Sequence, residues 1–145
     1  MKFATLTLRV SAVALAAMAM MNAAKAANQP AYNPASAVAV SGVITGVRHV
    51  AAGQPLEGVH LTVKTKTETI DVYLGPADFL KMLRTSFPIG EEVDVTGSRV
   101  KFQNTPVILA REVSEDLATL TLRELDGAPV WENWGVEADP ATIHE

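Results

Sequence analysis

The chain has 145 residues and carries 12 lysines and arginines against 16 aspartates and glutamates, a formal net charge of −4 at pH 7. This negative balance disfavours nucleic acid and anionic lipid as partners unless one face is locally basic. The sequence contains no cysteine, which excludes disulfides, thiol nucleophiles, cysteine-linked lipid anchors and cysteine-ligated metal centres.

The N-terminal segment has the pattern of a secretory signal peptide. Lys2 and Arg9 precede an apolar run at residues 10–21, and residues 24–26 read Ala-Lys-Ala, an A-x-A cleavage site. The run is shorter than the roughly 20 residues that span a bilayer, so cleavage is favoured over an uncleaved anchor. We predict a signal peptide at residues 1–26 and a periplasmic protein, with extracellular release as the alternative. Cleavage would remove three basic residues and leave a net charge of −7.

The rest of the chain predicts one domain with two irregular ends. Residues 27–36 contain two prolines among small polar residues and predict a flexible lead-in. The domain is predicted at residues 37–134. Residues 135–145 contain few apolar side chains and predict a loose acidic tail.

Within the domain, apolar residues alternate with polar ones, as in strands that have one buried face. The helical spacing of apolar residues after Pro76 predicts one short helix within residues 76–87. A further strand within residues 115–125 and a turn at Asp126-Gly127 predict a C-terminal hairpin. The five main strands are predicted at residues 38–50, 59–64, 70–74, 92–102 and 107–113.

This order, three strands, a helix and two strands, predicts an all-β fold with one short helix: a small five-stranded OB-like barrel plus a C-terminal hairpin. Apolar positions change from even to odd after Gly42, and from odd to even after Gly97. We expect β-bulges at both glycines, because tight barrels use bulges to bend. The second change would turn Val100 and Phe102 toward the core. The competing fold is an open sheet with the helix on one face.

Several motifs resemble a known family. The segments "VAVSGVITGV" at residues 38–47, "VHLTVKTKTETIDVYL" at 59–74 and "EVDVTGSRV" at 92–100 resemble the bacterial periplasmic OB-fold (BOF) family. The run at residues 98–131 is similar to small uncharacterised exported bacterial proteins. The resemblance implies an OB fold and a link to envelope stress and ligand binding, without an established enzyme activity.

The sequence offers little for catalysis. Its serines lie in no nucleophile-elbow motif, and "GVITGV" opens no helix and is not a dinucleotide fingerprint. Glu92 and Asp94 share a strand face, which is more typical of a solvated edge than of a catalytic pair. We therefore predict a non-enzymatic protein without a cofactor.

A metal site is conceivable at one loop. His49 and His60 flank this loop, and Glu57 lies between them, so the three side chains could bind a transition metal. The more ordinary interpretation is that the histidines are solvated at strand ends.

Two basic patches are candidates for ligand binding. Lys64 and Lys66 continue the polar face of the second strand, and Tyr73 on the third could offer a stacking surface. Arg99 and Lys101 share one face of the fourth strand, which ends in the turn "QNTP" containing Asn104. The alternative is a solubilising strand face that discourages edge pairing.

These observations favour an exported, non-catalytic binding or adaptor module of the bacterial envelope. Its partner would be an envelope protein or an anionic or sugar-bearing ligand. A periplasmic metal-binding protein is the first alternative, and nucleic-acid binding, suggested only by the fold, is the second. Trp131 is expected to dock on the core; exposed together with Trp134, it would instead suggest a binding surface.

Overall fold

The computed structural model describes residues 29–133, so the predicted signal peptide, the acidic tail and Trp134 lie outside the described residues. Within residues 29–133 no helix is long and apolar enough to cross a membrane. The elements are η1 Pro34–Ser36, β1 Ala37–Val50, β2 Gly58–Lys64, β3 Thr69–Gly75, α2 Ala77–Met82, β4 Glu92–Phe102, β5 Thr105–Glu115, β6 Ala118–Thr121 and η2 Val130–Asn133.

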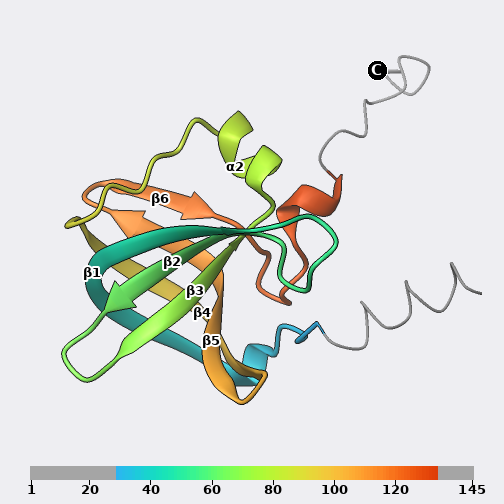
Figure 1. Ribbon diagram of the computed structural model, residues 1–145, viewed down its shortest axis with the longest axis horizontal. Coiled ribbons are helices and arrows are strands. Elements are labelled where there is room, and N and C mark those ends of the chain that lie inside the picture. The colour runs from blue at the N-terminus through green and yellow to red at the C-terminus, as the bar shows by residue number, and fades with distance from the viewer. Residues whose placement is uncertain (1–28, 134–145) are drawn as a thin grey trace, which may run out of the picture.

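Five strands form a closed ring in the order β1-β2-β3-β5-β4, and the short helix α2 follows β3 (Figure 1). All neighbours in the ring are antiparallel except β3 and β5, which close it through a short parallel pairing from Asp71–Val107 to Tyr73–Leu109. The predicted all-β, OB-like fold with one short helix is therefore confirmed, and the open-sheet alternative is wrong.

The predicted C-terminal hairpin is present in a short form. Strand β6 extends the sheet by pairing with β5 outside the ring. The chain then turns at Asp126-Gly127, where Arg123 and Pro129 form an isolated bridge. The hairpin leads into η2, which brings Trp131 back to the barrel.

The inside of the ring is an apolar core closed at one end by α2. Phe79 and Leu80 are the buried residues of this helix, and Asp78 lies in its first turn. The helix lies within the predicted residues and ends at Met82, and Arg84 has a positive φ of 54° that interrupts the helical path. The buried core comprises Ile44, Val59, Leu61, Val63, Ile70, Val72, Leu74, Phe79, Leu80, Val93, Val95, Ile108, Ala110, Val113 and Leu122.

A second apolar cluster lies on the outer side of β3 and β5. Its buried members are Leu56, Tyr73, Val107 and Leu109, and Tyr32, Val100, Phe102 and Trp131 pack against it. The expectation that Val100 and Phe102 face the barrel core is therefore wrong. Register explains this, because Val100 lies opposite Val107, a member of the outer cluster, whereas core residue Ile108 lies opposite Arg99. The docking predicted for Trp131 is confirmed.

The segment before β1 is attached to the barrel. The Asn33 side chain caps η1, and its backbone N–H donates to Ser98 Oγ at 3.0 Å. The Ser36 and Ser98 hydroxyls lie 2.7 Å apart. Residues 29–36, within the predicted flexible lead-in, thus make specific contacts with β4 and the outer cluster.

The two bulges occur, but not at the predicted residues. In β1 the extra residue is Thr45, between the pairs Ile44–Val63 and Gly46–Thr62. Near Gly97 the extra residue is Arg111 on β5, the strand opposite.

Gly42 and Gly97 are instead required for close approach of the backbone. A Cβ at Gly42 would lie 2.5 Å from the Lys64 carbonyl oxygen, and one at Gly97 would lie 2.2 Å from that of Leu109.

Gly42→Ala tests this steric requirement. Because strand backbone rather than a flexible side chain would have to move, we expect a loss of about 1–3 kcal/mol in the free energy of unfolding. Gly46→Ala is the matched control in the same strand. Its Cβ would meet Thr62 Oγ1 at an ordinary 3.4 Å, so it should be neutral or stabilising by up to about 1 kcal/mol. Urea unfolding of both variants measures the difference, and equal midpoints would refute the explanation.

Candidate binding site

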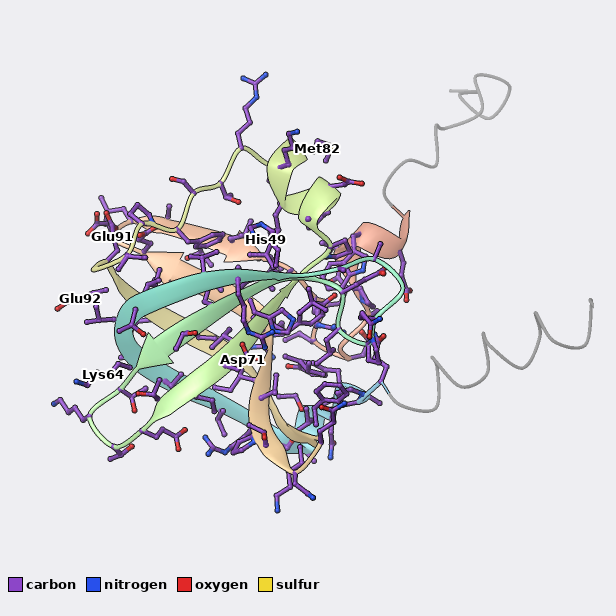
Figure 2. All side chains as sticks on the ribbon, in the orientation of Figure 1. His49, Lys64, Asp71, Met82, Glu91 and Glu92 are labelled. Atoms are coloured by element: carbon purple, nitrogen blue, oxygen red, sulfur yellow. The ribbon has the colours of Figure 1, made fainter. Side chains whose placement is uncertain are left out.

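The six residues predicted to bind a ligand do not form one surface. Lys64 and Lys66 lie at the β2–β3 turn and line a pocket of about 650 Å³ together with Glu92, Asp94 and Asp116. These carboxylates make this pocket more acidic than basic. Figure 2 labels Lys64 and Glu92 on this side of the barrel.

Arg99 is already engaged within the chain. Its guanidinium forms a two-pronged ion pair with the Glu68 carboxylate. The hydrogen bond from Arg99 lowers the pKa of Glu68 below its usual value. Lys101 and Asn104, by contrast, are exposed beside the tip of the β4–β5 hairpin.

Tyr73 and His60 are buried, contrary to the expected solvated outer face. Tyr73 is 4% exposed, and its ring lies 5.0 Å from that of His60 and 6.4 Å from that of Trp131. Tyr73 is therefore not available for stacking on a ligand. The reason is the outer cluster, which covers this part of β3 with the N-terminal segment and η2. Burial raises the pKa of Tyr73 to about 12, so its hydroxyl keeps its proton near neutral pH.

The side chains considered for a metal site, His49, Glu57 and His60, do not lie together. His60 is 2% exposed, and its two ring nitrogens lie 2.9 Å from Asp71 Oδ2 and 2.7 Å from the Leu56 carbonyl oxygen. His49 lies on the opposite face of β1, in a groove beside α2 (Figure 2), because Arg48 is the residue paired with His60. Residues 29–133 contain no group of three or more His, Cys, Asp or Glu side chains placed to hold a metal ion.

These buried polar groups instead fix the β1–β2 loop at residues 51–57. His60 contacts the Leu56 carbonyl oxygen, and the Tyr73 hydroxyl donates to the Glu57 carbonyl oxygen at 2.8 Å. The Gly53 N–H donates to the Glu57 carboxylate at 2.5 Å. Arg48 donates to Asp71 at 2.8 Å, which holds the carboxylate beside His60. The loop is therefore anchored by side chains of the barrel.

A groove runs between this loop and the β4–β5 hairpin. Its volume is about 650 Å³, and we name it the loop groove. Both turn residues of the hairpin, Gln103 and Asn104, have positive φ, as a tight two-residue turn requires. The groove is lined by Gln29, Pro30, Gln54, Pro55, Lys101, Phe102 and Gln103.

A second pocket of about 490 Å³ adjoins the loop groove and shares Gln29 and Pro30 with it. We name it the Arg123 pocket after the buried arginine in its wall. Tyr32, Tyr73 and Trp131 also line it. Sequence reasoning missed Tyr32 and Arg123 because their contact joins residues 91 positions apart. The one available signal was an arginine directly after the apolar alternation that ends at Leu122.

The closed five-stranded ring, with a groove between its β1–β2 and β4–β5 loops, defines a small OB-like β-barrel protein. The chain belongs to the MamS/MamX magnetosome protein family, whose model matches residues 36–120. No curated protein matches the chain. The family match covers the whole ring, while Tyr32, Arg123 and Trp131 lie outside it.

Tyr73→Phe tests whether the hydroxyl anchors the β1–β2 loop. It removes one buried hydrogen bond, so we expect about 1 kcal/mol less stability and faster hydrogen exchange of the backbone amides at residues 51–57. Tyr32→Phe is the control, because it removes a buried hydroxyl that has no hydrogen-bond partner within residues 29–133. It should not destabilise the protein. Unchanged exchange in Tyr73→Phe would show that the loop does not depend on this bond.

A carboxyl pair lies elsewhere on the barrel, where β4 begins and β5 ends. A hydrogen bond with Glu91, together with burial and the charges of Glu91 and Asp116, raises the pKa of Glu115 from 4.5 to about 7. The folded state therefore favours the protonated form of Glu115. Its contribution to stability is fully present below pH 4.5 and is lost as the pH rises through about 7.

Glu115→Gln should remove this pH dependence, since glutamine does not ionise. We expect the variant to melt a few °C above the wild type at pH 8 and close to it at pH 4.5. The difference is small because the carboxyl is partly solvated. Glu124→Gln, at an exposed position, controls for the loss of one negative charge. If Glu115→Gln changes the melting temperature by the same amount at both pH values, the raised pKa of Glu115 is not the cause.

Proposed function

We propose that this protein is an exported, non-catalytic binding module of the bacterial envelope, and that it holds a segment of a partner protein in the loop groove. The observation that carries the proposal is the groove itself, formed where OB-like barrels usually bind their ligands, between the β1–β2 and β4–β5 loops. The signal-peptide pattern supports export. Membership of a family named for magnetosome proteins supports a role at the magnetosome.

The lining of the groove suits an extended peptide. Gln29, Gln54 and Gln103 offer amide donors and acceptors that can pair with a peptide backbone. Pro30 and Pro55 add rigid apolar surface between them. These groups suit an uncharged main chain better than a polyanion.

Lys101 gives the groove its charge preference. It is the one basic residue in the lining and is exposed. A single cation at the rim favours an acidic side chain on the partner, and such rim charges act on association rate and specificity more than on affinity.

The anchored β1–β2 loop favours binding without rearrangement. Its contacts with His60 and Tyr73 keep one wall of the groove in place. A wall that is already ordered loses less conformational entropy when the partner binds. The BOF resemblance, which implies an OB fold and ligand binding, agrees with this role.

Site-specific photo-crosslinking in intact cells tests the proposal. A photoreactive phenylalanine analogue at Gln54 or Gln103 should crosslink to one and the same envelope protein. The analogue at Leu117, which is fully exposed in the β5–β6 turn, is the control and should not. Lys101→Glu should reduce the crosslink severalfold, whereas Lys81→Glu makes the same charge change on α2 and should leave it intact.

Two results would contradict the proposal. Crosslinks from Leu117 alone would place the partner on another face. A protein that stays in the cytoplasm with its first 26 residues uncleaved would refute export.

A further inference from the structure

The Arg123 pocket holds a buried cation that makes no direct ion pair within residues 29–133, although the negative charge of Glu132 acts on it from beyond ion-pair distance. Arg123 is 7% exposed, and no Asp or Glu within residues 29–133 forms an ion pair with it. Its guanidinium carbon lies 5.0 Å from the Trp131 ring centroid and 5.5 Å from that of Tyr32. These cation–π contacts replace only part of the lost hydration.

Two hydrogen-bond donors at this pocket are unsatisfied. Arg123 Nη1 donates to the Gly127 carbonyl oxygen at 2.9 Å, but the buried Nε–H has no acceptor within the described residues. The buried Tyr32 hydroxyl has none either. A buried donor without an acceptor typically costs about 1–3 kcal/mol. Both donor atoms are shielded from solvent, so an acceptor in the pocket would satisfy them after a small shift of the surrounding side chains. A carboxylate fits best, because its two oxygens match the guanidinium fork.

The other charged residues of the pocket are acidic. Glu57, Asp126 and Glu132 line it with Arg123, so its lining carries three carboxylates and one cation. This excess of negative charge opposes a multiply charged anion such as phosphate. It favours a ligand that also carries ammonium groups.

The pocket also has apolar walls between these charges. Pro30, Pro76 and the Trp131 ring contribute to its lining. They can cover the aliphatic chain of a small ligand, and a volume of about 490 Å³ suffices for one.

We propose that the Arg123 pocket binds a small zwitterion of the amino-acid class, with its carboxylate at Arg123 and its ammonium groups at the acidic residues. A basic amino acid, with one carboxylate and two ammonium groups, fits this charge pattern best. The inference goes beyond the proposed function and does not depend on a protein partner, since the four charged residues on which it rests lie outside the loop groove.

Isothermal titration calorimetry of the purified protein with three probes tests the proposal. L-lysine carries all three charges, cadaverine lacks the carboxylate and hexanoate lacks both ammonium groups. We expect saturable binding of lysine, with both other probes about tenfold weaker or worse, because each loses one side of the charge pattern.

Variants separate the pocket from unspecific charge effects. Arg123→Met keeps the bulk and removes the cation, and should weaken lysine binding about tenfold or more. Arg84→Met makes the same charge change on an exposed loop and should not weaken lysine binding. Glu132→Gln should weaken lysine binding severalfold but should not weaken hexanoate binding, because hexanoate gains from the loss of a like charge.

Three results would overturn the proposal: no saturable lysine binding, hexanoate binding as tightly as lysine, or cadaverine binding as tightly as lysine. The second would indicate a plain anion site and the third a plain acidic site. If Arg123→Met does not fold, as judged by urea unfolding, Arg123→Lys and Glu132→Gln decide the question. Arg123→Lys keeps the charge but loses the fork, so wild-type affinity in it would also count against the carboxylate contact.

Discussion

The parallel pairing of β3 with β5 is the contact on which the rest of this structure depends. It closes the sheet into a ring and so creates the inner core, but it also sets Tyr73, Val107 and Leu109 side by side on the outside. This outer apolar surface must be removed from water, and the chain covers it with Leu56, Tyr32 and Trp131. One loop and two segments flanking the barrel are thereby drawn to the same side, and both the loop groove and the Arg123 pocket arise where these segments meet.

The covering layer also determines where polar groups are buried. His60 and Tyr73 enter it from neighbouring strands, and each uses its polar atoms to hold the backbone of the β1–β2 loop. The loop is consequently a fixed wall rather than a flexible lid. Arg123 enters the same layer from the C-terminal hairpin, where two aromatic rings and one carbonyl group contact its guanidinium. On the side of the β1–β2 loop, the buried polar groups of this layer are thus hydrogen-bonded. On the side of the hairpin, Arg123 Nε has no acceptor within residues 29–133.

The strand order, the short helix and the closed ring could be predicted from the sequence, because they follow from local alternation, turn residues and the position of the helix. The faces of the strands were harder to predict. Alternation shows that Val100 and Phe102 share a side, but a second apolar cluster outside the ring looks the same in the sequence as the core inside it. For the same reason His60 and Tyr73 were expected on a wet face. Of the predicted ligand-binding residues, Lys101 lies in the loop groove. The Arg123 pocket depends on contacts between segments about 90 residues apart, for which local patterns carry no signal.

The first and last residues of the described segment come together at one place on the barrel. Gln29 and Glu132, near the two ends of the described segment, line the same pocket, and the β5–β6 turn with Leu117 takes no part in either binding surface. The chain therefore enters the described barrel and leaves it beside the same pocket, at Gln29 and at Glu132. A shift of either segment on the barrel would therefore change the shape of the Arg123 pocket.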